Sequence, residues 1–460
     1  MIRDAAHIPL VSSGSYPLRE GCRVRPLVDG EPAFRRICEA VEAARSRVWI
    51  TVAFIELDMQ MPDGRGSFFD VLDRAVERGI ELRVIFWRPV EIDPRETGTY
   101  FDGSQEERHW LAERGSRFPP RWDCLPGNAC QHQKSWLIDA GLEGEVGFVG
   151  GINLEKASVA PPGHCPREEG DIHDVYLELQ GPVVSDIHHN FVQRWNEASE
   201  RNRSDGAWPA DAKPGDLSFP GVASPTAGDA VVQLTRTIQA GRYSDGTAPP
   251  GGAPFAIGGG EFSVFDQYIA AIDRAERSIY LEDQVIGSPK IVGHLKAALE
   301  RGVAVVFLVP GNAHPEYRAA REIPATKPFF DLVASLGDFD HFLLAGIASN
   351  AKAGGYYDVY VHAKIMLIDD AWATIGSTNT ADRSFFGDTE MNASFWHGET
   401  TRALRCELLR EHLGADTSGL DDVAALGLMR ERARQNQSRR ERGERLLGLA
   451  FAIDPAKYGS

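Results

Sequence analysis

Apolar and polar residues alternate along this chain in a helix-then-strand order that occurs twice. Residues 42–51 (EAARSRVWIT) predict the end of a helix followed by an apolar, β-branched run, and residues 273–282 (DRAERSIYLE) repeat that order. Residues 73–87 (DRAVERGIELRVIFW) and 296–310 (KAALERGVAVVFLVP) each predict an amphipathic helix, a Gly at its C-terminal end and a buried strand. The repeat distance is close to half of the 460 residues. The pattern therefore predicts an α/β protein made of two similar halves.

A change in composition marks the junction between these halves. Residues 205–262 are rich in Gly, Pro, Ala and Asp, and within them only residues 231–238 (VVQLTRTI) have the pattern of a strand. We therefore place the first half at residues 1–227 and the second at residues 228–460. Residues 240–260 are expected to form a mobile loop.

Composition and charge narrow the class of protein. Hydrophobic residues make up 43% and charged residues 25%, as in soluble globular proteins, and the net charge of −17 argues against general nucleic-acid binding. The tail from residue 417 has a helical pattern, and its Arg-rich part, residues 430–445, either docks on lipid phosphates or forms a solvated face with internal ion pairs. No signal peptide or transmembrane run is visible. We expect a cytoplasmic or peripheral membrane protein.

The cysteines indicate neither a disulfide framework nor a metal site. The six cysteines are scattered over the chain, and Cys124 and Cys130 have no second pair at a zinc-ligand spacing. The full set is Cys22, Cys38, Cys124, Cys130, Cys165 and Cys406. We expect reduced thiols, no metal and no cofactor.

One short motif also occurs twice, as HQKSWLID from His132 and as HAKIMLID from His362. Each copy predicts a strand, a tight turn, a second strand and then a Gly-rich break that contains an Asn. Alternation along the first strand places its His and Lys on one face. Asp139 and Asp369, which end the two copies, fall on the opposite face, and we interpret them as structural residues that satisfy neighbouring backbone or basic groups.

Two His-Lys pairs supply what phosphodiester chemistry needs. A neutral imidazole attacks phosphorus, a protonated one delivers a proton to the leaving oxygen, and two lysines offset the charge of the transition state. Each His also needs a partner for its second ring nitrogen. Asp174 and Glu390 are the acidic candidates that follow His132 and His362, respectively. A surface or strand-end carboxylate is the alternative for either one.

The doubled motif, with the turns GGIN (150–153) and GSTN (376–379), resembles the phospholipase D superfamily. The segments 173–197 (HDVYLELQGPVVSDIHHNFVQRWNE) and 280–284 (YLEDQ) extend the resemblance, which covers roughly residues 30–415. It implies two similar α/β/α sandwich halves related by a pseudo-twofold duplication, with one active site at their interface. It also implies catalysis through a covalent phosphohistidine.

The family's usual assignment makes His132 the nucleophile and His362 the general acid, although the residues themselves leave the two symmetric. The resemblance also implies groups that hold the phosphate: Lys134, Lys364, Asn153, Asn379, Gly151 and Ser377.

Several substrates remain open. We favour a phospholipase D that hydrolyses glycerophospholipids and also transfers them to alcohols, acting as a monomer at a membrane surface. The alternatives are a cardiolipin or phosphatidylserine synthase, a nuclease or other non-lipid phosphodiesterase, and an inactive lipid-binding scaffold. The net charge of −17 disfavours nucleic acid as a partner, and the intact His and Lys residues disfavour the scaffold.

Overall fold

The computed structural model describes residues 7–90, 100–115, 118, 120–127, 129–164, 170–200 and 215–460. Cys165 and the first part of the predicted junction, residues 205–214, lie outside the described residues.

The first half contains these elements: β1 (Arg19–Val28), α1 (Gly30–Ala43), β2 (Arg47–Val52), β3 (Gln60–Met61), β4 (Gly66–Ser67), α2 (Phe68–Glu77), β5 (Glu81–Trp87), α3 (Gln105–Glu113), β6 (Pro120–Asp123), β7 (Ser135–Ile138), β8 (Val146–Gly150), β9 (Ile172–His173), β10 (Val175–Gln180) and α4 (Val184–Asn196). The second half contains these: β11 (Ala230–Ile238), β12 (Glu261–Phe262), α5 (Ser263–Arg274), β13 (Ser278–Glu282), α6 (Pro289–Glu300), β14 (Ala304–Leu308), α7 (Pro315–Arg321), α8 (Lys327–Ser335), β15 (Phe342–Asn350), β16 (Tyr356–Val361), β17 (Ile365–Ile368), β18 (Trp372–Gly376), α9 (Asp382–Phe386), β19 (Glu390–Trp396), α10 (Gly398–Leu413), α11 (Asp422–Glu441) and β20 (Ala450–Ile453).

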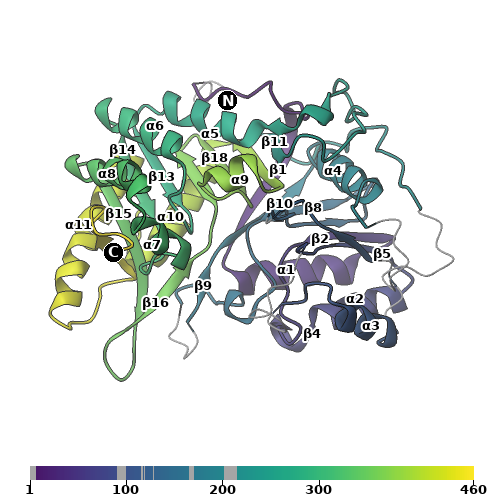
Figure 1. Ribbon diagram of the computed structural model, residues 1–460, viewed down its shortest axis with the longest axis horizontal. Helices are drawn as coiled ribbons and strands as arrows, with labels where there is room; N and C mark the ends of the chain where they lie inside the picture. The colour runs from purple at the N-terminus through teal and green to yellow at the C-terminus, as the bar shows by residue number, and fades with distance from the viewer. Residues whose placement is uncertain are drawn as a thin grey trace.

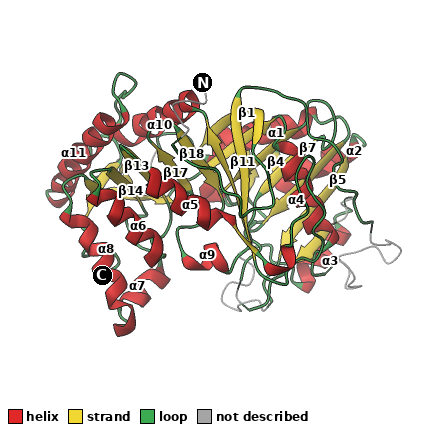
Figure 2. Ribbon diagram, turned by 90° about the horizontal axis from the view of Figure 1, so that it is seen from above, coloured by secondary structure: helices red, strands yellow, loops and turns green. Residues whose placement is uncertain are grey.

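The two sets of strands pair with the same connectivity. In the first half β2 is parallel to β5 and antiparallel to β7, β5 is parallel to β6, and β8, β10 and β1 continue the sheet antiparallel. In the second half β13, β14, β15, β17, β18, β19 and β11 take the corresponding places. The equivalent strands β1 and β11 pair antiparallel with each other, so the two sheets are continuous across the centre of the molecule (Figure 2). This is the predicted α/β duplication.

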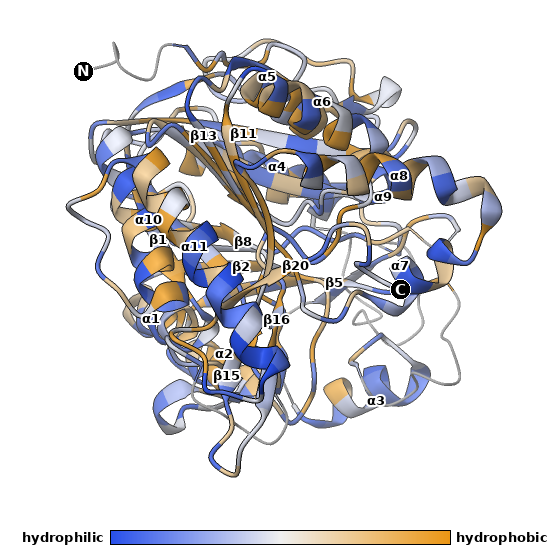
Figure 3. Cartoon of the chain, turned by 90° about the vertical axis from the view of Figure 1, so that its left-hand side faces the viewer, coloured by the Kyte–Doolittle hydropathy of each residue, from blue (hydrophilic) through white to orange (hydrophobic). Residues whose placement is uncertain are grey.

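Helices cover both faces of each sheet because neighbouring residues of a strand point to opposite layers. Val48 and Ile50 of β2 pack in one core with α1 and α2, whereas Trp49 packs in another with α4 and stacks on Phe191 at 5.1 Å between ring centroids. The second half repeats this order, with α5 and α6 on one side and α10 and α11 on the other. Most strand residues in the interior of the protein are accordingly hydrophobic (Figure 3). The two halves lie side by side (Figure 1).

The predicted order of helix, Gly and strand is confirmed in both halves. Gly79 has φ 85° after α2 and leads into β5, and Gly302 has φ 89° after α6 and leads into β14. Glycine adopts this left-handed backbone without the penalty that a side chain brings, and it ends the helix.

The junction between the halves has the predicted strand, but the segment after it is more ordered than its composition suggests. Residues 231–238 form β11 as predicted, and they are the edge along which the two sheets meet. Residues 240–260, expected as a mobile loop, are hydrogen-bonded to α4, because His189 Nε2 lies 2.8 Å from Thr247 O and Gln193 Nε2 donates to Asp245 O at 2.7 Å. The boundary between residues 227 and 228 stays a prediction. No helix among the described residues has the length and apolar composition to cross a bilayer.

Candidate active site

The two His-Lys motifs meet where the halves touch. His132 and Lys134 precede β7, and His362 and Lys364 precede β17, so their predicted position inside the strands is wrong by one to three residues. The reason is that their backbones bond across the interface: His132 N donates to O of Thr389 of the second half at 2.9 Å, and His362 N donates to a carbonyl of the first half at 2.8 Å. Both imidazoles are buried, with 6% and 7% exposure.

Each histidine is oriented by a carboxylate from the opposite half. Glu390 Oε1 and Oε2 each lie 3.0 Å from His132 Nδ1, and Asp174 Oδ2 lies 2.5 Å from His362 Nδ1. The sequence order suggested the reverse pairing, which is wrong. The cause is the meeting of β8 and β10 with β18 and β19 across the interface, which carries Asp174 and Glu390 past the histidines of their own halves.

Burial keeps both imidazoles neutral in the free protein. It lowers the pKa of His132 and of His362 well below the usual value, and the neighbouring lysines add to that effect. Burial also raises the pKa of Glu390 to about 8 and that of Asp174 to about 6. It lowers the pKa of Lys364 to about 8, although the nearby carboxylates oppose this shift. The site therefore has several groups that titrate near neutral pH.

The lysines are held in place by their own motifs. Lys134 Nζ donates to the His132 carbonyl at 3.0 Å, and Lys364 Nζ donates to the His362 carbonyl in the same way. Lys364 also lies 3.4 Å from Gln284 Oε1. Each ammonium group therefore has the same position relative to the histidine of its own motif, one from each half.

The Gly-rich turns bring the two halves into contact. A Cβ at Gly151 would lie 2.6 Å from Asp174 Oδ1 and 2.9 Å from Lys364 Cδ, so only glycine allows this approach. Asn153 Nδ2 donates to Glu155 Oε1 at 2.9 Å, which fixes the amide beside the site.

The second Gly-rich turn differs from the first. The Ser377 hydroxyl, predicted to touch phosphate, donates to Glu390 Oε2 at 2.5 Å, and the Ser377 carbonyl lies 3.1 Å from His132 Nδ1. Ser377 therefore positions the Glu390–His132 pair. Asn379 is buried on the same turn, with its Oδ1 unbonded among the described residues.

Several neighbours of the site were not among the predicted residues. Phe54 lies against His132 at 6.0 Å between ring centroids, and its ring lies 5.8 Å from Lys134 Nζ. Asp283, within the segment quoted as YLEDQ, accepts from Thr380 N at 2.6 Å and stabilises the charge of Lys364. An aromatic residue and a strand-end carboxylate at these positions give no signal in one sequence that distinguishes them from core residues.

Asp139 and Asp369 occupy equivalent turns away from the histidines. Asp139 accepts from the backbone N–H groups of residues 45–47, and Asp369 accepts from those of residues 276–278, at 2.7–3.2 Å. Each therefore fixes the turn that leads into the central strand of its half, β2 or β13.

The duplicated α/β fold brings two carboxylate-oriented histidines and two lysines to one interface, and these are the groups that phosphoryl transfer requires. A family model for phospholipase D matches residues 162–306, and one described as cardiolipin synthase, phospholipase D-like domain, matches residues 268–411. The chain belongs to the phospholipase D superfamily.

Similar proteins agree with this assignment. A probable cardiolipin synthase of Bacillus subtilis is 24% identical over 388 residues, which cover 83% of this chain and 64% of the relative. Phospholipase D A of Dictyostelium discoideum is 23% identical over 463 residues, which cover 83% of this chain and 33% of the relative. The chain thus spans less than two thirds of either. The fold matches a phosphatidylserine synthase of Haemophilus influenzae with TM-score 0.54 at 12% identity, over 94% of this chain and 97% of that one.

Proposed function

We propose that this protein is a phosphatidyltransferase of the cardiolipin synthase type. It moves a phosphatidyl group from one glycerophospholipid to a hydroxyl of an acceptor lipid through a phosphohistidine. The observation that carries the proposal is the pair of buried histidines, each held by a carboxylate of the other half. The sequence alone favoured a hydrolase. We now prefer a synthase because the relatives include a probable cardiolipin synthase and others with that name.

The surroundings of the two histidines support different roles for them. His132 Nδ1 faces the Ser377 carbonyl, which can only accept, and a carboxylate, so its ring hydrogen lies on Nδ1 and Nε2 keeps its lone pair. That is the tautomer a nucleophile needs. His362 Nδ1 makes a short bond to Asp174, which favours the imidazolium that a general acid needs.

In the first step His132 Nε2 attacks the phosphorus of the donor lipid. A nitrogen–phosphorus bond forms, the phosphorus–oxygen bond to the leaving alcohol breaks, and His362 gives its proton to that oxygen. The negative phosphodiester offsets the positive field of Lys134 and Lys364 and raises the pKa of His362, so the acid becomes charged when substrate binds. The two lysines hold the non-bridging oxygens throughout.

In the second step the acceptor hydroxyl gives its proton to His362 and attacks phosphorus, and the bond to His132 breaks. Asn153 and Asn379 add donors to the phosphate without adding charge. Because both imidazoles are more than nine-tenths buried, the intermediate is shielded from bulk water, which favours a bound acceptor alcohol over hydrolysis. Substrate and acceptor both lie in a bilayer, so the proposal includes contact with a membrane surface; the monomeric state stays a prediction.

The test is product analysis by mass spectrometry after incubation with vesicles of phosphatidylglycerol and phosphatidylethanolamine, alone, with serine and with ethanol. We expect a lipid with two phosphatidyl groups as the main product, and none with His132→Asn. Phosphatidic acid as the main product in every arm would instead identify a phospholipase D, and phosphatidylserine formed only with serine would identify the serine-accepting type. Cleavage of single- or double-stranded DNA at low salt with lipid untouched would reject a lipid enzyme.

A further inference from the structure

A second cluster of ionisable side chains lies outside the His-Lys site and has no part in the chemistry above. Asp29, His164, His173 and Glu411 each direct one ligand atom to a common point, and these atoms lie within 4.8 Å of one another. Asp29 follows β1, His164 lies in the loop before β9, His173 is in β9 and Glu411 is in α10. We call these four residues the His164–His173 cluster.

The distances between these four atoms are close to those of a four-coordinate site. His164 Nε2 lies 3.3 Å from Asp29 Oδ1, 3.0 Å from Glu411 Oε1 and 3.3 Å from His173 Nδ1. His173 Nδ1 lies 2.9 Å from Asp29 Oδ1 and 3.4 Å from Glu411 Oε1. Ligands about 2.0–2.2 Å from a tetrahedral zinc ion stand about 3.3–3.6 Å apart. Three of these five distances are 3.3–3.4 Å, and the other two, at 2.9 and 3.0 Å, are shorter.

Hydrogen bonds alone do not account for this arrangement. Glu411 Oε1 is buried, and its neighbours are the same two ring nitrogens, His164 Nε2 at 3.0 Å and His173 Nδ1 at 3.4 Å. The two ring nitrogens face each other at 3.3 Å, where each has at most one hydrogen to place among three neighbours. An ion at the centre gives every one of these atoms a partner.

The Asp29 side chain points to this cluster and does not cap its own helix, α1. It stands at the N-cap of α1, where an Asp ordinarily accepts from a backbone N–H of the first turn, but its side chain makes no such bond. Its φ of 65° is a costly conformation for a residue with a side chain. The backbone is therefore shaped to turn this carboxylate toward the histidines.

The groups behind the cluster are those that typically support a metal-bound imidazole. His173 Nε2, on the far side of the ring, lies 2.8 Å from Glu282 Oε2. Glu282 Oε1 in turn accepts from the Tyr280 hydroxyl at 2.5 Å and lies 3.0 Å from His412 Nε2. A carboxylate on the outer nitrogen fixes the tautomer that leaves the inner nitrogen free to bind a cation.

From this geometry we propose that the His164–His173 cluster binds one structural zinc ion. Two imidazoles and two carboxylates suit zinc, which accepts nitrogen and oxygen ligands in four-fold coordination, whereas calcium and magnesium prefer six or more oxygens. The two carboxylates balance its charge in a buried place. Four protein ligands close the coordination sphere, which is typical of a structural ion.

The ion would join the halves beside the acid histidine. Three ligands come from the first half and Glu411 from the second. Asp29 N donates to the Asp174 carbonyl at 2.8 Å, and the His173 carbonyl accepts from His362 N at 2.8 Å. The ion thus fixes the backbone that carries the Asp174–His362 pair.

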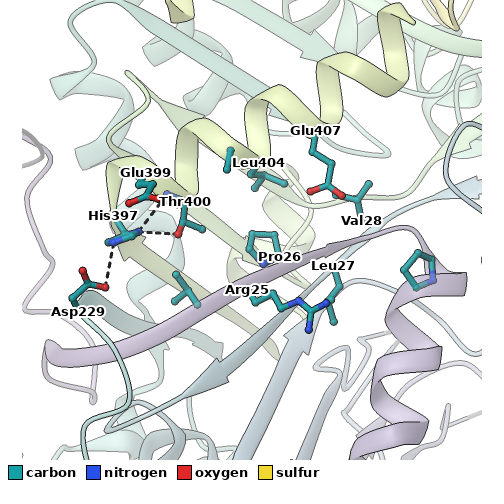
Figure 4. A pocket seen from close by; sticks show the side chains of 13 residues that line it. Arg25, Pro26, Leu27, Val28, Asp229, His397, Glu399, Thr400, Leu404 and Glu407 are labelled. Carbon is teal, nitrogen blue, oxygen red and sulfur yellow. Dashed lines mark hydrogen bonds and ion pairs between the residues drawn. The ribbon is translucent and has the colours of Figure 1, made fainter. Parts of the chain in front are cut away.

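A cavity lies next to two of the segments that carry the cluster. It has a volume of about 510 Å³ between β1 and α10, and Val28 and Glu407 line it. Val28 precedes Asp29, Glu407 lies one helical turn before Glu411, and the two line the same end of the cavity in Figure 4.

The test begins with the wild-type chain without an affinity tag, purified from zinc-containing medium and desalted. Elemental analysis should give about one zinc per chain. Cobalt in place of zinc should give the strong visible absorption of a tetrahedral site, independent of enzymatic activity. Less than about 0.1 zinc per chain after addition of zinc and desalting, or cobalt spectra of six-fold coordination, would overturn the proposal.

Variants then locate the ion. His164→Ala and Glu411→Gln should each weaken zinc binding at least tenfold in competition with a chelator, and Glu282→Gln should weaken it about 10- to 100-fold. The matched controls His294→Ala and Glu431→Gln, which alter a half-buried imidazole and an exposed carboxylate elsewhere, should bind as the wild type does. Unchanged binding in both His164→Ala and Glu411→Gln would reject the cluster as the site. Should those variants fold poorly, a chelator should lower the Tm of the wild type, and an unchanged Tm counts against a structural ion.

Discussion

In the first half His132 Nδ1 lies between Glu390 and the Ser377 carbonyl, whereas in the second half His362 Nδ1 has one hydrogen-bond partner among the described residues, Asp174 at 2.5 Å. The strands around them pair identically. Duplication therefore supplied the same groups twice, and we infer from their different neighbours that His132 acts as the nucleophile and His362 as the acid.

The largest effect is expected from the histidines themselves. His132→Asn and His362→Asn should each lower kcat by about four orders of magnitude or more, because the two act as a unit, and the double variant should be no slower than either one. Steady-state assays on phosphatidylglycerol vesicles measure this. A double variant much slower than both single variants would mean two independent sites.

Labelling distinguishes the two roles. An acid-quenched reaction on a phosphorus-labelled lipid should leave label on the peptide that contains His132, and His362→Ala should lengthen its lifetime, because the acid also serves as base for the acceptor. Label found only on the peptide with His362 would reverse the assignment.

The next largest effect is expected from Glu390 and Asp174, the two carboxylates that bind the histidine of the opposite half. Glu390→Gln and Asp174→Asn should each cost about 10²–10⁴-fold in kcat, since a misplaced tautomer disables its imidazole. A phosphodiester with a nitrophenolate leaving group should restore most of the activity of Asp174→Asn, because that group departs without a proton, and little of Glu390→Gln. Equal restoration in both variants would contradict distinct roles.

The pH dependence should be a narrow bell near pH 8. Glu390 has a pKa raised to about 8 by burial, so it is protonated below that pH and the acid limb reports its loss of charge. Lys364 has a pKa lowered to about 8, chiefly by burial, so it is neutral above that pH and the alkaline limb reports it. Lys364→Arg should shift the alkaline limb of kcat/KM to higher pH, because arginine keeps its charge there.

Ser377→Ala should move the other limb. The Ser377 hydroxyl lowers the pKa of Glu390, so its removal raises that pKa and shifts the acid limb to higher pH. Limbs that stay fixed in both variants would assign the titration to other groups.

The smallest effect is expected from Asp139 and Asp369, whose carboxylates hold the turns before β2 and β13. Asp139→Asn and Asp369→Asn should each lower the free energy of unfolding by about 1–3 kcal/mol, because three backbone N–H groups lose a charged acceptor. Asp369→Asn should cost more, since its carboxylate also lies 2.8 Å from His7 Nε2. Urea denaturation measures this, and kcat of the folded protein should change less than about twofold. A large loss of kcat at unchanged stability would give these residues a catalytic role.

The sequence by itself determined the duplication, the helix–Gly–strand order and the two His-Lys motifs. These depend on local periodicity and on residue spacing, which act through neighbours along the chain. The two halves share the same strand connectivity because their sequence patterns are similar, and the equivalent strands β1 and β11 then pair with each other.

Only the tertiary structure decided which carboxylate holds which histidine, and that Ser377 positions Glu390. It also brought together Asp29, His164, His173 and Glu411, which lie far apart along the chain except for the two histidines, and the sequence predicted no such cluster. These contacts depend on how the two halves pack against each other. That packing is determined by the buried cores of both halves together, and no local sequence pattern encodes it.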